Sequence, residues 1–278
     1  MKEIKSIILK VFIILVREIL KWWRNKFKVF TTVTQPFIWT IFFGIGLGKI
    51  INVNEISSIL NYSGPINYLI FIFPGMIGTT VIFVSFGFGH SFVEEKERGF
   101  LKPLILSPTP TWVIILGKII ASGIVGGLQG FLVNILSFFY FKDIGVTFLT
   151  LPVLIILGIL SGAIGIFFAI FFKNINSYDS LLFFLVIPAI LLSGAYFPIE
   201  LTPLWMIKIS QFNPFYYGIE MVKKTFFTSI SIEKDFSNLK EILITKGFGI
   251  LESVFLNLFF IILFIVLISV IIKNKSLE

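Results

Sequence analysis

Long apolar segments alternate with short polar ones along almost the whole chain. Each apolar segment approaches the roughly 20 residues that a helix needs to cross the hydrocarbon core of a bilayer. The pattern therefore predicts an all-α polytopic membrane protein, with residues 1–278 forming a single transmembrane domain of six transmembrane helices. The expected spans are residues 29–47, 68–92, 111–140, 148–172, 180–196 and 248–272.

Residues 1–28 follow a different pattern. Apolar residues recur there at helical spacing, lysine and arginine residues lie between them, and Trp22 and Trp23 stand near the end. This combination is typical of an amphipathic helix that lies in the membrane interface, with tryptophan at the headgroup level. We expect such an interfacial helix to lead into the first span.

The loop between the second and third spans contains the most charged short run between the first and last spans. Its acidic and basic residues are expected to continue the second helix into water until a glycine ends it. The apolar residues that follow are spaced to share one face of a short second helix. That face must bury against lipid headgroups or another protein; a helix that only anchors the loop is the alternative. The residues concerned are Glu94, Glu95, Glu97, Arg98, Gly99, Phe100, Leu101 and Leu104.

Residues 197–247 form the longest segment outside the expected spans. The first part is too apolar for a free loop, and Pro198, Pro203 and Pro214 interrupt it. We interpret residues 203–211 as a short helix that dips into the bilayer and residues 214–227 as an amphipathic return. Such backbone is tolerated only where protein or a water-filled cavity shields it. The pattern thus predicts an external re-entrant segment before the sixth span.

Composition and charge agree with a membrane protein and suggest its orientation. The chain is 56% hydrophobic and only 14% charged, whereas soluble domains are about a quarter charged. The net charge of +8 lies largely beside the spans, so it does not indicate nucleic-acid binding. With the N-terminus inside, the short inner segments carry fourteen lysine and arginine residues and the short outer ones two. We expect the protein in the plasma membrane of the cell. The positive-inside rule then places both termini and residues 94–110 on the cytoplasmic side.

A few polar residues fall inside the expected spans. Lys118 lies about two turns into the third span and is expected to extend its amine to the cytoplasmic surface. Gln129 and Asn134 lie deeper, where hydrogen bonds between helices are favoured over substrate contact. His90, the only histidine, is expected at the interface with a water or backbone partner, and a proton relay is the less favoured alternative.

The residues needed for several kinds of chemistry are missing from the sequence. The chain has no cysteine, which removes thiolate metal sites and cysteine nucleophiles. A P-loop requires Gly, four residues, Gly-Lys and Ser or Thr; the strings around Gly48-Lys49 and Gly117-Lys118 lack both the first glycine and the final hydroxyl residue. We therefore expect no catalytic residue, no metal site and no cofactor on this chain.

Two motifs resemble a known family. The run ERGFLKPLILSPTP follows the second span, and LSGAYFPIELTP followed by FNPFYY precedes the last one. Both are similar to segments of type-2 ABC exporter permeases, the membrane subunits of ATP-driven exporters. The resemblance implies that the charged loop is a cytoplasmic coupling helix that contacts an ATPase. It also implies an outer gate at Ser193, Gly194, Phe197, Pro198, Asn213 and Pro214.

The resemblance implies partners as well. Two ATPase subunits would hold ATP and magnesium, and a second permease would complete a homodimer or heterodimer in membrane lipid. The 35 phenylalanines favour a hydrophobic or amphipathic cargo, such as a lipid, a drug-like molecule or a lipid-linked glycan. The alternatives are an ion channel or membrane scaffold without an ATPase, and, less favoured, an intramembrane enzyme.

Overall fold

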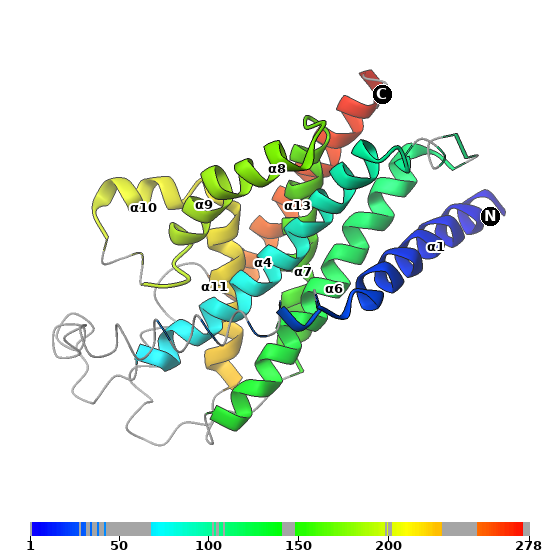
Figure 1. The fold of residues 1–278 in the computed structure, drawn as a ribbon. Coiled ribbons are helices and arrows are strands. Elements are labelled where there is room, and N and C mark those ends of the chain that lie inside the picture. Colours follow the sequence, from blue (N-terminus) through cyan, green and yellow to red (C-terminus); the bar gives the residue numbers. More distant parts are fainter. Residues whose placement is uncertain are drawn as a thin grey trace.

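The structure, a computed structural model, is helical wherever it describes regular elements. It describes residues 2–27, 29–31, 34, 38, 42, 68–101, 103, 106–107, 109–140, 148–197, 199, 202–229 and 249–274. Within these ranges the long helices pack side by side into one bundle (Figure 1). The all-α prediction is confirmed for this part of the chain.

Four helices in the described ranges are long and apolar enough to cross a membrane. They are α4 (Tyr68–Glu97), α6 (Thr111–Tyr140), α7 (Thr150–Ala169) and α13 (Ile250–Asn274). They coincide with the second, third, fourth and sixth expected spans. Most of the first expected span, residues 29–47, lies outside the described residues, so the six-span layout stays a prediction.

The fifth expected span is built from three short pieces. The chain passes from α8 (Ile175–Leu181) through a π-helical turn, η1 (Leu182–Val186), into α9 (Ile187–Leu191). Pro188 stands in the first turn of α9, where a missing N–H is tolerated. Directly before it, the Ile187 N–H donates to the Leu182 carbonyl five residues back, as π-helices do. This apolar stretch is shorter than the four long helices.

α4 is the central helix of the bundle. In α4, 89% of an 18-residue apolar window is buried inside the chain, whereas in α13 only 17% of such a window is buried. α4 packs against α6, α7 and α11 (Pro214–Ser229). Glycine lets α6 and α7 approach closely, because a Cβ added to Gly158 would lie 2.9 Å from the Cα of Gly123. The apolar surface of α13 is therefore left largely exposed in this chain.

The N-terminal helix is confirmed as a helix, α1 (Lys2–Arg24). It lies along the outside of α6 (Figure 1), where Ile14 contacts Gly117. Its buried side faces α6, while Ile8 and Phe12 are exposed. Its position relative to a bilayer stays a prediction.

Two helices occupy the segment expected to be re-entrant, α10 (Leu204–Ser210) and α11. α11 runs antiparallel to α4: Ile219 lies against Gly78, and Phe226 lies near Phe73, earlier in α4, with ring centroids 6.1 Å apart. The start of α11 therefore lies deeper in the bundle than its end (Figure 1). α10 thus leads into the start of α11, which lies inside the bundle; the depth of both helices in a bilayer stays a prediction. Residues 230–248 lie outside the described residues.

Candidate functional site

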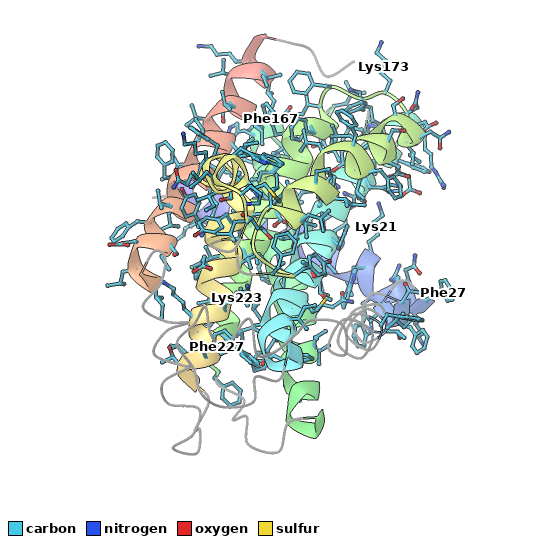
Figure 2. The ribbon with its side chains drawn as sticks, turned by 90° about the vertical axis from the view of Figure 1, so that its left-hand side faces the viewer. Lys21, Phe27, Phe167, Lys173, Lys223 and Phe227 are labelled. Carbon is cyan, nitrogen blue, oxygen red and sulfur yellow. The ribbon has the colours of Figure 1, made fainter. Side chains whose placement is uncertain are left out.

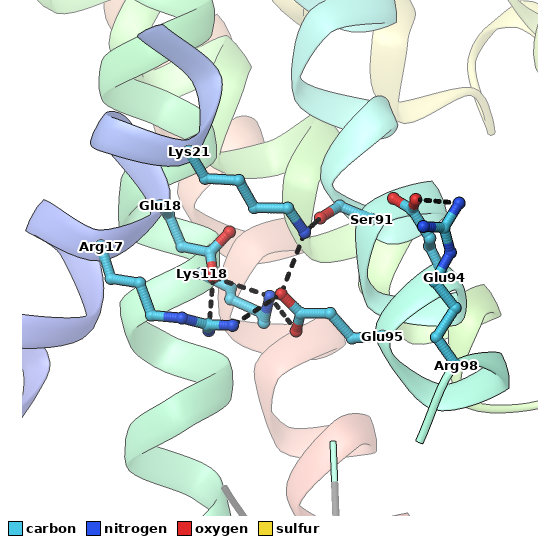
Figure 3. Close-up of polar contacts among 8 residues, drawn as sticks. All are labelled: Arg17, Glu18, Lys21, Ser91, Glu94, Glu95, Arg98 and Lys118. Carbon is cyan, nitrogen blue, oxygen red and sulfur yellow. Dashed lines mark hydrogen bonds and ion pairs between the residues drawn. The ribbon is translucent and has the colours of Figure 1, made fainter. Parts of the chain in front are cut away.

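The charged loop begins where α4 ends, at the end of the bundle that we call the Gly99 end. α4 continues through Glu97, and Gly99 follows with φ of +77°. Both features were predicted, and glycine is suited to this left-handed conformation. Glu94 and Arg98 form an i,i+4 ion pair of 3.0 Å on the surface of this last turn (Figure 3).

Two further side chains of the last turn of α4 fasten it to the turn between α7 and α8. Glu97 Oε2 accepts a hydrogen bond from the Ile175 N–H at 3.0 Å, which satisfies a free donor at the start of α8. Lys96 Nζ donates to the Ile170 carbonyl at 3.2 Å. The end of α4 is thus joined to the start of the α8–α9 stretch, so displacement of one would be felt by the other.

A buried cluster of charges lies beside this end of α4. Lys118 Nζ of α6 lies 2.8 Å from Glu18 Oε1 of α1 and 2.8 Å from Glu95 Oε2 of α4 (Figure 3). The Lys118 side chain is 0% exposed. The expectation that Lys118 reaches the aqueous surface is therefore wrong, because two carboxylates from neighbouring helices hold its amine inside.

Two cations of α1 complete this cluster, which we call the charged knot: Arg17, Glu18, Lys21, Glu95 and Lys118. Arg17 pairs with Glu95 at 2.9 Å and with Glu18 at 3.0 Å. Lys21 pairs with Glu95 at 3.0 Å and donates to Ser91 Oγ at 2.7 Å. Buried charges are tolerated when each is paired, and here the pairs join α1, α4 and α6.

Sequence reasoning missed the charged knot. The available signal was the Arg17-Glu18 pair within an otherwise apolar stretch, together with a lysine inside the third span. Each charge alone had an ordinary interfacial explanation. Only the packing of α1 along α6 shows that Glu18 and Lys118 meet.

The apolar residues of the loop divide into two kinds. Phe100 is 62% exposed, but Leu101 is only 3% exposed and belongs to the core of this chain. Insertion of the Leu101 side chain into a partner's groove does not agree with that burial. Glu95 is buried likewise. Leu104 lies outside the described residues, as do other positions of the expected short helix, so the coupling role of the loop stays a prediction.

Gly99 allows a graded stability test of the loop. Ala at φ of +77° is strained by about 1 kcal/mol, whereas Asn tolerates this conformation better. Among the described residues, no atom lies within 4 Å of an added Cβ, so none of them obstructs it. In detergent, the unfolding temperature should be highest for the unmodified protein, lower for Gly99→Asn and lowest for Gly99→Ala. Equal stability of all three would show that the turn relaxes at no cost.

The second group of expected residues lies at the connections that join α9, α10 and α11, away from the Gly99 end; we call this region the Gly194 end. Gly194 has φ of +75°, and its carbonyl accepts a hydrogen bond from Lys223 Nζ. Ser193 Oγ donates to the Ile190 carbonyl at 2.6 Å. The next residue, Ala195, lies against Gly75 of α4. This turn is therefore tied to both α11 and α4.

The Asn-Pro motif begins α11. Asn213 Oδ1 accepts from the Phe215 N–H at 3.1 Å, and its Nδ2 donates to the Ala189 carbonyl of α9 at 2.5 Å. Pro214 is the first residue of α11, a position at which proline costs no hydrogen bond. Phe197 packs near Tyr216 in the same cluster. Five of the six expected gate residues thus lie at the two connections between α9, α10 and α11, while Pro198 lies outside the described residues; gating itself stays a prediction.

For the other polar residues of the expected spans, one predicted contact is confirmed and one is corrected. Asn134 Nδ2 donates to Thr150 Oγ1 of α7 at 2.8 Å, which confirms a hydrogen bond between helices. His90 Nε2 lies 3.5 Å from Asp179 Oδ2 of α8; the expected water or backbone partner is corrected to a carboxylate. Among the described residues, no three His, Cys, Asp or Glu side chains are grouped to hold a metal ion.

The geometry defines a class of protein: a helical membrane bundle whose central helix links a charged loop at one end to a packed turn at the other. The sequence model of the ABC-2 type transporter family matches residues 10–227, more than half of the chain. The chain belongs to the ABC-2 type transporter family.

Three relatives are similar to long parts of the chain. It is 26% identical over 186 residues to "Probable multidrug ABC transporter permease YbhR" of Escherichia coli K12, covering 66% of this chain and 50% of that one. It is 28% identical over 192 residues to the inner membrane transport permease YadH of the same strain, covering 68% and 72%. It is 26% identical over 221 residues to the transport permease ycf38 of Cyanophora paradoxa, covering 77% and 73%. The match thus spans half the length of YbhR.

Proposed function

We propose that this protein is the membrane-spanning permease subunit of an ATP-driven exporter whose energy comes from separate ATPase subunits. The observation that carries the proposal is the Gly99 end. The charged knot there fastens α1 and α6 to the last turn of α4, directly before the exposed Phe100. Membership in the ABC-2 type transporter family supports it.

In this proposal the Gly99 end faces the cytoplasm and receives the motion of the ATPase pair. Phe100 would contact the ATPase, with Glu94 and Arg98 beside it. The charged knot would keep α1, α4 and α6 together, so that the push moves them as one body. The pairing of buried charges makes this joint costly to separate.

The second part of the proposed mechanism is transmission along α4. This helix has 30 residues and is therefore about 45 Å long. Gly75 near its far end contacts Ala195 in the turn that we expect to form the outer gate. Glu97 holds the start of α8 at the near end. A displacement at the Gly99 end would reach the Gly194 end along both routes and open a path at the seam with a second permease.

The proposed cargo is hydrophobic or amphipathic. Phe183, Phe184 and Leu191 of the α8–α9 stretch are exposed, as are many apolar residues of α13, so the bundle offers apolar rather than charged surface along its length. The printed name of YbhR calls it a multidrug permease. A lipid, a drug-like molecule and a lipid-linked glycan all have this chemistry, and the partner permease is either a second copy or a different chain.

The proposal is tested by replacing the exposed Phe100 side chain of the loop by a charged one. Phe100→Asp should reduce co-purification of the ATPase and ATP-dependent transport by about tenfold or more, because a carboxylate replaces an apolar contact at the proposed interface. Leu149→Asp is the matched control: it is also exposed, it precedes α7 at the other end of α6, and Asp is a good N-cap. Its transport and ATPase recovery should equal those of the unmodified protein.

Co-purifying chains are identified by mass spectrometry after mild-detergent extraction from the native cell. A soluble chain with a P-loop in stoichiometric amount supports the proposal, and a second membrane chain beside it indicates a heterodimer. Recovery of this chain alone, under conditions that preserve related complexes, would favour a channel or scaffold. Equal effects of the two Asp variants would exclude Phe100 as the contact.

A further inference from the structure

A small pocket opens between α1 and α4 at the edge of the charged knot. Its volume is about 90 Å³, room for roughly three water molecules, so it fits a compact polar group and not a whole amphipathic molecule. The described lining residues belong to α1, to the position directly after it, and to α4: Glu18, Lys21, Trp22, Asn25, Gly87, Phe88, Ser91 and Glu94. The pocket is therefore a gap that the long side chains of α1 and α4 enclose.

The pocket lining is rich in hydrogen-bond donors. Lys21 Nζ lies there with Ser91 Oγ at 2.7 Å (Figure 3). Trp22 Nε1 is buried and meets no acceptor among the residues that the structure describes. A buried indole N–H usually has a partner, and leaving it without one costs free energy. A ligand that accepts hydrogen bonds would satisfy it.

The charges around the pocket favour an anion over a cation. The two lining carboxylates already face cations: Glu18 lies 3.0 Å from Arg17 and 2.8 Å from Lys118, and Glu94 lies 3.0 Å from Arg98. Of the charged residues that line the pocket, Lys21 is basic and Glu18 and Glu94 are acidic. When their ion-pair partners Arg17, Arg98, Lys118 and Glu95 are included, cations outnumber carboxylates by four to three.

The surface beside the pocket is apolar. Leu20, Trp23 and Phe27 are all exposed, and Phe27 projects from the end of the N-terminal segment (Figure 2). Aromatic and apolar residues next to basic ones are typical of helices at the level of lipid headgroups. The neighbourhood therefore offers a polar recess for a headgroup and an apolar surface for acyl chains.

We propose that this pocket binds the phosphate group of an anionic glycerophospholipid, with the acyl chains along the exposed apolar side of α1. Lys21 supplies the charge and Trp22 Nε1 donates a hydrogen bond to a phosphate oxygen, so the lipid bridges α1 and α4. Basic pockets between membrane helices recognise lipid headgroups in this way. The proposal does not depend on ATP-driven transport, and its test needs no ATPase.

The test compares two tryptophans in purified protein, one in the pocket and one outside it. Trp22→Phe keeps an aromatic ring but removes the N–H, whereas Trp205→Phe makes the same change on an exposed side chain of α10. The probe is short-chain phosphatidylglycerol, titrated by native mass spectrometry and by thermal shift. We expect Trp22→Phe to weaken binding about tenfold or more, the usual effect of one hydrogen bond to a charged group, and Trp205→Phe to bind like the unmodified protein.

Two further ligands test whether binding requires both the phosphate and the acyl chains. Diacylglycerol of the same chain length lacks the phosphate and should give no comparable shift, while soluble glycerol phosphate should bind far more weakly than the lipid because it lacks acyl chains. Equal binding of diacylglycerol, or equal effects of the two Phe variants, would overturn the phosphate site. Equal affinity for glycerol phosphate would overturn the assignment to a lipid. Unfolding temperatures without lipid verify that each variant is folded.

Discussion

Replacing Lys118 by methionine is expected to lower the free energy of unfolding by about 3 kcal/mol, the cost of leaving a buried charge without its partner. Methionine approximates the length of the lysine stem but supplies no charge to Glu18 Oε1 or Glu95 Oε2, each 2.8 Å from the amine. Arg17 still pairs with both carboxylates, but from a half-exposed position. α1 should then separate from α6 more readily than the rest of the bundle unfolds.

The absence of cysteine from the chain makes this separation measurable. A single Ile14→Cys thiol would be buried between α1 and α6, so its reaction with a maleimide reports opening of that contact. We expect labelling to be slow in the Ile14→Cys protein and much faster when Lys118→Met is added. Lys208→Met, on the exposed surface of α10, is the control and should change neither labelling nor unfolding temperature.

A third variant shows whether Lys118→Met loses stability because carboxylates are left unpaired or because side-chain packing is lost. Lys118→Met combined with Glu18→Gln and Glu95→Gln removes the carboxylates that the lysine neutralises, with little change in shape. Replacing a complete buried ion pair by neutral groups is often close to neutral, so this protein should recover much of the lost stability. If Lys118→Met alone labels as slowly as the parent, the charged knot is not what holds α1 to the bundle.

The charged knot also shows what the sequence could and could not predict. Helix bounds follow from local information: apolar runs, Gly99 as a stop, and Asn213-Pro214 as a start were all readable, and α6 has the bounds that were expected. The partners of Lys118 are not local. Glu18 lies 100 residues away, and periodicity does not say which face of α1 meets which face of α6.

Burial of the loop residues was unpredictable for a similar reason. Phe100 and Leu101 are adjacent and equally apolar, yet one is exposed and the other belongs to the core. The difference depends on where the α7–α8 turn lies, because Lys96 and Glu97 fix the end of α4 against it. A short apolar run predicts that some of its side chains are buried. Only the packing shows which of them are buried within the same chain.

The second large effect is expected at the other end of α4. Gly75→Ala would place a Cβ 1.9 Å from the carbonyl oxygen of Ala195 and 2.7 Å from its carbon. Both are backbone atoms, so the turn at Gly194 must move away from α4 by more than 1 Å, an overpacking that costs about 1–3 kcal/mol. Moving the turn also strains the hydrogen bond from Lys223 to the Gly194 carbonyl. We expect a lower unfolding temperature and loss of most of the proposed ATP-driven transport.

Gly78→Ala is the matched control, since it lies one turn later on the same helix. The nearest atom to its added Cβ is Ile219 Cδ1 at 2.4 Å, the end of a flexible side chain that can rotate away, so stability and transport should change little. Comparable losses in both variants would mean that α4 tolerates no added methyl on this face, and the Ala195 contact would lose its special role. Loss confined to Gly75→Ala would instead connect transport to the turn at Gly194, because the two substitutions differ mainly in whether backbone or side chain must yield.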